Sequence, residues 1–273
     1  MIHATAVVHP RAQLDSSVEI GPYSVIDEHV IVGPGCHIGP HVYLTGLTTI
    51  GAHNQFHAGC VIGDAPQDLK YKGAPTRLRI GDHNVFREHV TAHRSNSATE
   101  DTVIGAHNFL MAHCHVAHNC RLGDHIIIAN GALLAGHVVV QDRAFISGNC
   151  VVHQFCTLGV LSFMQGGSAI SKDLPPFTVA RRGENALGGL NSVGLRRAGF
   201  STQERMELKR LYHALFASGL GLRDALAQAR PSVSSAAAQT LLDFVAASKR
   251  GVCTAKGQAG DDGNAPADGR DHL

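Results

Sequence analysis

The sequence predicts a parallel β-helix followed by a small helical domain, and three observations support this prediction. Large apolar residues recur at every sixth position, glycine is abundant with 30 residues while tryptophan is absent, and the pattern stops near residue 175. A period of six fits neither the 3.6-residue repeat of an α-helix nor a long alternating strand, but it fits short strands that turn and stack. We therefore divide the chain into a β-helix over 1–186, helices over 187–250 and a disordered tail over 251–273.

The six-residue register begins at Ile2 and can be followed to Ile170. Of the 29 positions in this series, 25 hold a bulky apolar residue, which chance does not produce. The exceptions are Asp68, Ala74, Ala92 and Ala98. Glycine often follows the large residue, where we expect a tight corner to use the positive φ that glycine tolerates. A small residue stands four places after the large one in most repeats. We expect three such repeats to make one coil, which gives a triangular prism.

Two polar segments, 64–79 and 94–103, interrupt the apolar register and are predicted to leave the coil as loops. Loops held by a rigid scaffold often carry specificity. A solenoid can also form a binding surface without any chemistry, so a trimeric binding scaffold is one alternative to an enzyme. Function is therefore sought where the chain departs from its repeat.

Charge and cysteine usage limit the classes of partner. Lysine and arginine total 23 against 22 acidic residues, so the net charge of +1 gives no reason to expect nucleic acid. No window approaches the roughly 18 apolar residues that span a bilayer, and the N-terminus lacks a signal-peptide pattern, so we expect no membrane span and a cytoplasmic location. Six of the seven cysteines share one repeat position as small wall residues, which argues against disulfides, and Cys253 falls in the polar tail.

The region after the repeats has the pattern of short amphipathic helices separated by proline and glycine. The expected helices are Leu187–Gly199, Thr202–Ser218, Gly221–Ala229 and Ser232–Lys249. A basic face on this domain would attract an acidic partner protein. Its residues are Arg196, Arg205, Lys209 and Arg210.

The chain has 19 histidines, and nine of them share one repeat position, where stacking at a corner explains them without chemistry. These are His29, His41, His53, His83, His89, His107, His113, His125 and His137. The denser run from His113 to His118 supports two further hypotheses. One is a zinc site, in which His113, His118 and a third ligand from an adjacent coil or subunit resemble the γ-class carbonic anhydrases. The other is acid–base catalysis by a neutral imidazole.

Stacking of the coils gives the acid–base hypothesis a geometry. Three hexapeptides make a coil of 18 residues, and neighbouring coils lie about 4.8 Å apart, so position 136 stacks beside position 118. Residue 136 is glycine, whose backbone N–H could approach a substrate carbonyl and stabilise an oxyanion. His137 follows directly, and His153 lies one coil further on.

Five short motifs carry a family resemblance. They are His-Val-Ala-His-Asn-Cys (115–120), Leu-Ala-Gly-His (134–137), Val-His-Gln-Phe-Cys (152–156), Gln-Asp-Leu-Lys-Tyr (67–71) and Asp-Leu-Pro-Pro (173–176). Together they resemble the UDP-N-acetylglucosamine O-acyltransferase family over about residues 2–249. The resemblance implies a homotrimer of left-handed β-helices that transfers an (R)-3-hydroxyacyl chain from acyl carrier protein to the 3-hydroxyl of the glucosamine, the first step of lipid A biosynthesis. It implies neither a metal nor a diffusible cofactor.

The resemblance also implies roles for individual residues. His118 matches the catalytic base, His115 its partner histidine, and Gly136 the oxyanion amide. Substrate contacts are implied for the loop residues Asp68, Leu69 and Lys70, for His137, His153 and Gln154 along the coil, and for Asn191 and Arg197 near uridine and phosphate. Gly166 matches the position that measures acyl length, where glycine favours a long chain.

The sequence departs from the family pattern at two site positions. Asn119 stands where the pattern has aspartate, so no carboxylate next to His118 can polarise its ring from there, and Val193 replaces an acidic residue expected at the ribose. The sister N-acyltransferase of the same pathway is a further alternative. That family carries an additional N-terminal uridine-binding domain, whereas the repeats begin here at Ile2, which favours the O-acyltransferase.

Overall fold

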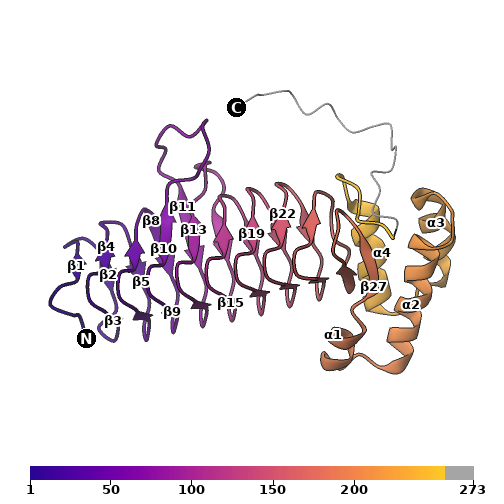
Figure 1. The fold of residues 1–273 in the computed structure, drawn as a ribbon, viewed down its shortest axis with the longest axis horizontal. Helices are drawn as coiled ribbons and strands as arrows, with labels where there is room; N and C mark the ends of the chain where they lie inside the picture. The colour runs from indigo at the N-terminus through magenta and orange to yellow at the C-terminus, as the bar shows by residue number, and fades with distance from the viewer. Residues whose placement is uncertain (256–273) are drawn as a thin grey trace.

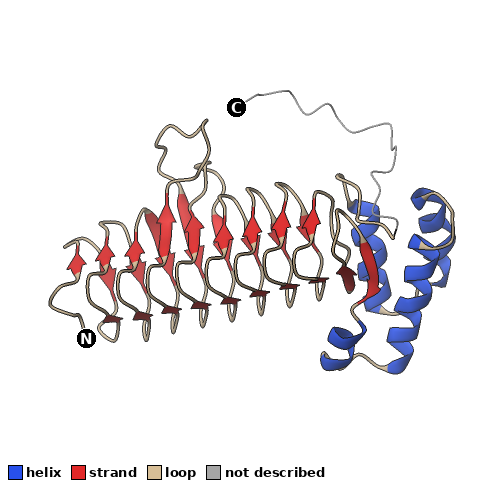
Figure 2. Ribbon diagram, in the orientation of Figure 1, coloured by secondary structure: helices blue, strands red, loops and turns tan. Residues whose placement is uncertain are grey.

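Short parallel strands follow one another around a three-sided prism in the computed structural model, which describes residues 1–255 (Figure 1). The strands stack into three sheets that run the length of the prism, and the helices gather at its C-terminal end (Figure 2). The predicted β-helix with a helical C-terminal region is therefore confirmed.

The first sheet contains β1 (Val7–Val8), β4 (Val25–Ile26), β7 (Tyr43–Leu44), β10 (Val61–Asp64), β13 (Thr91–His93), β16 (His115–Val116), β19 (Leu133–Leu134), β22 (Val151–Val152) and β25 (Ala169–Ile170). The second contains β2 (Gln13–Leu14), β5 (Ile31–Val32), β8 (Leu47–Ile50), β11 (Arg77–Ile80), β14 (Thr102–Ile104), β17 (Arg121–Leu122), β20 (Val139–Val140) and β23 (Thr157–Leu158). The third contains β3 (Glu19–Ile20), β6 (His37–Ile38), β9 (Gln55–Phe56), β12 (Val85–Phe86), β15 (Phe109–Leu110), β18 (Ile127–Ile128), β21 (Phe145–Ile146), β24 (Phe163–Met164), β26 (Thr178–Ala180) and β27 (Leu187–Leu190).

The register of the strand pairs explains how two loops fit into a regular coil. Paired residues are ordinarily 18 positions apart, as in Val8 and Ile26. Across the first loop Ile62 pairs with Ala92, 30 positions on, and across the second Ala92 pairs with Val116, 24 positions on. The inserts therefore add twelve and six residues, which are whole repeats, and the apolar register continues on their far side.

The corners of the prism use positive φ, but not at the glycines where the sequence led us to expect it. Eight of the nine corner histidines have φ between 55° and 62°, while His29 does not. Their rings stack from coil to coil, with His83 and His107 centroids 4.9 Å apart. The glycines after the large residues mostly have ordinary φ, and their role is steric. A Cβ on Gly33 would lie 2.8 Å from the backbone of Gly51, so these sites let adjacent coils approach closely.

The helical region consists of α1 (Ser192–Arg197), α2 (Thr202–Phe216), α3 (Leu222–Ala229), a short 3-10 turn (Arg230–Ser232) and α4 (Ala236–Ala247). Leu208 of α2 and Leu242 of α4 are fully buried and pack with Leu161 and Phe177 of the last coils. No helix within residues 1–255 has the length and apolar character needed to cross a bilayer.

Three boundaries differ from the sequence prediction. The helix expected over Ser232–Lys249 begins only at Ala236, after the 3-10 turn. The helix expected over Leu187–Gly199 is wrong at its start, because Leu187–Leu190 pair antiparallel with β26 and the helix begins only after Asn191 caps it. Gly188 and Gly189 favour this outcome, since glycine is a poor helix former. Residues 251–255, assigned to the tail, instead pair with the end of the prism, and Cys253 is fully buried. The rest of the predicted tail, 256–273, lies outside the described residues.

A buried carboxylate links two of the helices. Glu207 of α2 is 7% exposed, and its oxygens accept hydrogen bonds from the backbone N–H groups of Ser234, at 2.6 Å, and Ser235, at 3.2 Å, just before α4 begins. These donors lower the pKa of Glu207 to about 2. The ionised carboxylate therefore stabilises the folded state at every pH above its ordinary range.

Glu207→Gln is expected to lower the free energy of unfolding by about 2 kcal/mol at pH 7, since it removes a charge that accepts several hydrogen bonds. Because the folded pKa lies below the unfolded one, the difference from wild type should be complete above about pH 4.5 and shrink as the pH falls toward 2. Urea unfolding at pH 7 and pH 3 measures it, with the exposed Glu184→Gln as control. An equal loss at both pH values would show that the charge is not responsible.

Candidate active site

Most of the predicted catalytic and substrate-binding residues lie along one edge of the prism. The turns that connect the first sheet to the second all lie along this edge, which we call the catalytic edge, and both inserts leave the coil there. In successive coils it contains the loops 65–76 and 94–101 and the turns 117–120, 135–138 and 153–156. Figure 1 shows the first loop standing away from the prism between β10 and β11. Residues distant in sequence are therefore brought side by side by the stacking of the coils.

His118 lies in the middle of the catalytic edge, and its ring is fixed on one side. Its Nδ1 is 2.9 Å from Oδ1 of Asn119, a residue that is only 4% exposed. The ring stands edge-on to that of His137, with centroids 5.2 Å apart. The predicted stacking of positions 118 and 136 is present in the structure: the N–H of His137 donates to the carbonyl of His118 at 3.0 Å.

Gly136 is buried directly beside the His118 ring. A Cβ at this position would lie 2.6 Å from Cε1 and 2.8 Å from Nε2 of His118, so only glycine leaves room for the imidazole. Within residues 1–255 the Gly136 N–H makes no hydrogen bond. Nε2 of His118 and the unpaired N–H of Gly136 therefore lie close together on the edge.

His115 forms a second, more buried layer behind His118. Its Nδ1 hydrogen-bonds to Oγ1 of Thr91 at 2.7 Å, and its ring packs edge-on against His93 at 4.8 Å. Burial, together with the neighbouring His93 and His118, lowers the pKa of His115 to about 4. His115 is therefore neutral at physiological pH, and no positive charge stands behind His118.

The first loop brings a carboxylate to the same edge. Asp68 accepts a hydrogen bond from Nδ2 of Asn96 at 2.6 Å and another from the backbone N–H of Lys70 at 2.9 Å. These donors, chiefly Asn96, hold the pKa of Asp68 below its usual range, with a smaller contribution from His118. Leu69 is 82% exposed and Lys70 is exposed, so both present themselves to solvent beside this carboxylate.

The remaining predicted residues of this edge follow in the next coils. Burial, and after it the proximity of His118, lowers the pKa of His137. His137 also stacks on Phe155 at 4.6 Å. His153 and Gln154 are exposed in the last turn, where Nδ1 of His153 lies 3.4 Å from the guanidinium of Arg250.

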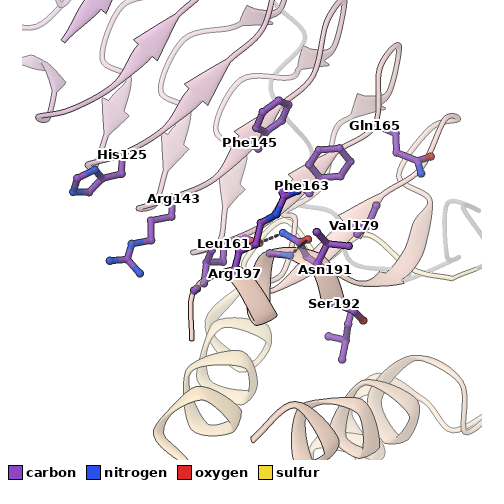
Figure 3. A pocket seen from close by; sticks show the side chains of 14 residues that line it. His125, Arg143, Phe145, Leu161, Phe163, Gln165, Val179, Asn191, Ser192 and Arg197 are labelled. Carbon is purple, nitrogen blue, oxygen red and sulfur yellow. Dashed lines mark hydrogen bonds between the residues drawn. The ribbon is translucent and has the colours of Figure 1, made fainter. Parts of the chain in front are cut away.

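The other predicted residues lie elsewhere on the chain. Asn191 and Arg197 line a cavity of about 1050 Å³ against the third sheet, whose walls include Phe145 and Phe163 (Figure 3). Asn191 is already engaged, because its side chain caps α1 through the Gly194 N–H at 2.9 Å and donates to the carbonyl of Leu161 at 2.9 Å. The guanidinium of Arg197 makes no ion pair within residues 1–255. One chain therefore holds two separate groups of predicted site residues.

Gly166 and Val193 complete the positions singled out in the sequence. Gly166 lies in the exposed turn between β24 and β25, on a different edge, and a Cβ there would meet only the carbonyl of Gly148 at 3.5 Å. Val193 is half exposed at the rim of the cavity that Arg197 lines.

The arrangement of histidines bears on the zinc hypothesis. His113 is an exposed corner residue that stacks on His89 at 5.1 Å, whereas His118 hydrogen-bonds to Asn119. Within residues 1–255 no group of three or more histidine, cysteine, aspartate or glutamate side chains has the arrangement of a metal site. The pairing of His113 with His118 as ligands is therefore not seen within the described part of the chain.

The second loop contributes two residues that sequence reasoning missed. The backbone N–H of Asn96 donates to Oδ1 of Asn119 at 3.0 Å, and Nδ2 of Asn119 donates to Oε2 of Glu100 at 3.2 Å. The sequence signal was the polar insert itself, one coil before His118. Which of its side chains turn inward depends on the loop backbone, which the repeat pattern does not determine.

A groove of about 810 Å³ on the helical region carries positive charge. Its lining residues include Arg181, Arg196, Arg205 and Lys209. Three of the four cations of the basic face predicted from the sequence are thus present together, while Arg210 is not among the lining residues.

Comparison with known proteins extends over nearly the whole chain. Residues 173–253 match the family model described as UDP N-acetylglucosamine O-acyltransferase, domain 2, and residues 11–46 and 101–136 match the bacterial transferase hexapeptide model. An acyl-[acyl-carrier-protein]–UDP-N-acetylglucosamine O-acyltransferase from Halorhodospira halophila is 49% identical over 92% of this chain and 98% of its own length. Another, from Janthinobacterium, is 47% identical over the same shares.

Solved structures agree with these matches. A UDP-N-acetylglucosamine acyltransferase structure from Francisella novicida superposes with a TM-score of 0.87 at 34% identity, covering 93% of this chain and 94% of that one. The Arabidopsis enzyme of the same description superposes with a TM-score of 0.82 at 37% identity, covering 93% of this chain and 100% of that one.

Proposed function

The chain belongs to the UDP-N-acetylglucosamine O-acyltransferase family, and from that premise we propose that it transfers an (R)-3-hydroxyacyl chain from acyl carrier protein to the 3-hydroxyl of UDP-N-acetylglucosamine. This reaction is the first step of lipid A biosynthesis, and we place it in the cytoplasm. The observation that carries the proposal is the position of His118, whose Nδ1 is held by Asn119 while Nε2 lies over Gly136.

His118 acts as the general base. Its Nε2 takes the proton of the sugar hydroxyl as that oxygen attacks the thioester carbonyl, and the carbonyl oxygen gains negative charge. The free N–H of Gly136 stabilises this charge as an oxyanion donor. When the intermediate collapses, the C–S bond breaks and the imidazolium of His118 returns the proton to the departing thiolate. No cofactor takes part in these steps.

His115 supports the base from behind. Because its pKa is lowered to about 4, it remains neutral and does not oppose the positive charge that His118 acquires during the reaction. Its hydrogen bond to Thr91 fixes the orientation of its ring, so the free ring nitrogen keeps one direction. We assign it a supporting role rather than the transfer of a proton.

The sugar and acyl chain lie along the catalytic edge. The ionised Asp68 accepts hydrogen bonds from the sugar, with Leu69 and Lys70 closing over it from the loop tip. His137, His153 and Gln154 contact the sugar or the acyl chain in the following coils. Gly166 lies on another edge of the prism, so we propose that it ends the acyl groove from a neighbouring subunit, where its lack of a side chain favours a long chain.

The nucleotide is bound by the second group of residues. Arg197 supplies a fixed cation for the diphosphate. Asn191 contacts the uridine while its side chain also caps α1. Because the cavity that holds them faces the third sheet, a single chain cannot join it to the catalytic edge. A homotrimer resolves this, since the edge of one subunit then meets the face of the next.

Acyl carrier protein binds at the cationic groove of the helical region. Arg196, Arg205 and Lys209 line this groove together with Arg181. An acidic carrier protein is attracted by such a surface, and the attraction raises the rate of association at low ionic strength.

The proposal is tested by offering two acceptors with a panel of hydroxyacyl carrier proteins. Acylation of UDP-N-acetylglucosamine is expected, with no acylation of the free 2-amine of UDP-3-O-acylglucosamine, and the rate should be the same after treatment with a chelator. Product on the amine alone would identify the N-acyltransferase instead. Loss of activity with chelator, restored by zinc, would support the metal hypothesis.

A further inference from the structure

Asn119 makes a set of contacts that defines the direction of its amide. Its oxygen Oδ1 accepts the backbone N–H of Asn96 at 3.0 Å and lies 2.9 Å from Nδ1 of His118. Its nitrogen Nδ2 lies 3.2 Å from Oε2 of Glu100. The Asn119 backbone is held as well, because its N–H donates to Oγ1 of Thr102 at 2.8 Å.

These partners leave only one orientation of the amide. A backbone N–H can only donate, and an ionised carboxylate can only accept. The oxygen of Asn119 must therefore face Asn96, and the nitrogen must face Glu100. In a flipped amide, the NH₂ group would face the N–H of Asn96, and the amide oxygen would face the carboxylate of Glu100. Both contacts would be repulsive.

The orientation of the amide in turn determines the tautomer of His118. An amide oxygen cannot donate, so the hydrogen bond between Oδ1 of Asn119 and Nδ1 of His118 requires the proton to lie on Nδ1. The lone pair of the neutral ring is then on Nε2, the nitrogen beside Gly136. This is the tautomer that a general base at that position needs.

We propose that Glu100 and Asn119 are positioning residues that hold His118 in the Nδ1–H tautomer, with the charge of Glu100 reaching the imidazole through the amide of Asn119. This inference rests on the proposed role of His118 as base. The carboxylate of Glu100, in the second loop, does not touch His118 directly. It acts through the side chain of Asn119, which lies between them. The negative charge also stabilises the imidazolium that forms during transfer.

The conformation at position 119 makes the arrangement testable. Asn119 has φ of +59°, which asparagine and aspartate tolerate better than other residues with a side chain. Asn119→Asp therefore keeps the backbone and places a carboxylate next to His118. In that variant Glu100 faces a like charge in place of an amide donor.

The kinetic test measures kcat for Glu100→Ala in both backgrounds. In the wild-type background, Glu100→Ala is expected to lower kcat about tenfold, because the amide of Asn119 loses one of the two contacts that orient it. In the Asn119→Asp background, the same change should leave kcat unchanged or raise it, because it removes a repulsion. No effect in the wild-type background, or the same loss in both backgrounds, would overturn the proposal.

A matched control separates this role from support of the loop. Asp101 anchors the same loop through Arg77 at 2.7 Å and Arg79 at 2.5 Å, and none of the bonds that we find for it reaches Asn119. Asp101→Asn should therefore change kcat by the same factor in the wild-type and Asn119→Asp backgrounds.

A spectroscopic measurement tests the tautomer without any reaction. In substrate-free protein with ¹⁵N-labelled histidine, the His118 signals are identified by their absence in His118→Gln. Wild type should show the Nδ1–H tautomer, and Glu100→Ala should show a growing share of Nε2–H. An Nε2–H ring in wild type overturns the inference. Failure of the proposed function would give a different pair of results. The wild-type protein would still show the Nδ1–H tautomer of His118, but a His118 variant would retain full turnover.

Discussion

His118→Ala is expected to lower kcat by about 10²- to 10⁴-fold, the range that a positioned general base contributes. The sugar hydroxyl would lose the Nε2 acceptor beside Gly136. The KM for UDP-N-acetylglucosamine should change little, because the proposed nucleotide contacts lie on another face. Steady-state kinetics with saturating acyl carrier protein measures both constants.

The control for this variant is another histidine of the same run. His113 stacks on His89 at a corner and has φ of +62°, so His113→Asn preserves the backbone preference. Its turnover should remain within about twofold of wild type. If His118→Ala keeps a comparable turnover while its fold and assembly are unchanged, the assignment of the base is wrong.

Gly136→Ala is expected to lower kcat by about 10²-fold, although it adds only one methyl group. The Cβ would lie 2.6 Å from Cε1 of His118, well inside contact distance, so the imidazole must move. Its movement breaks the hydrogen bond between Nδ1 and Asn119 and displaces Nε2 from the reacting hydroxyl. Misplacement of a catalytic group by about 1 Å is sufficient for a loss of this size.

Gly148→Ala provides the matched control, because Gly148 occupies the same repeat position two repeats further along. A Cβ there meets only the carbonyl of Asn130, at 3.3 Å, and we expect nearly wild-type turnover. The double variant Gly136→Ala, His118→Ala is a second check. With the imidazole absent, the added methyl group has no ring to displace and should cost much less. An equal cost in both backgrounds would mean that Gly136 acts independently of His118.

The repeat made most of the prism predictable. Core positions such as Ile62 and Val116 were identified because the six-residue register places them on the inside of every coil, and the stacking of 118 with 136 followed from the length of one coil. The corner histidines were expected to stack, and most of their rings do so. Their positive φ was not foreseen, since glycine was the expected residue for that conformation.

The irregular parts could not be predicted in the same way. The directions of Asn96 and Glu100 depend on how a non-repeating loop folds back on the edge, and no periodicity specifies this. Cys253 looked like part of a polar tail because its contacts with the end of the prism are made far from it in sequence. Asn191 and Arg197 were singled out by family resemblance alone, which gave no sign that they would lie on another face of the chain.

The two inserts leave and rejoin the prism at the same edge, and each adds a whole number of repeats. The coils on either side consequently keep their pairing, so the frame is mechanically independent of what the inserts contain. The spacing between His118 and Gly136 therefore does not depend on the length of the inserts, whereas the orientation of His118 depends on the second insert, which supplies Asn96 and Glu100 to Asn119. A change of acceptor preference is therefore expected to arise in the first insert, which carries Asp68, while the second insert retains the residues that orient the base.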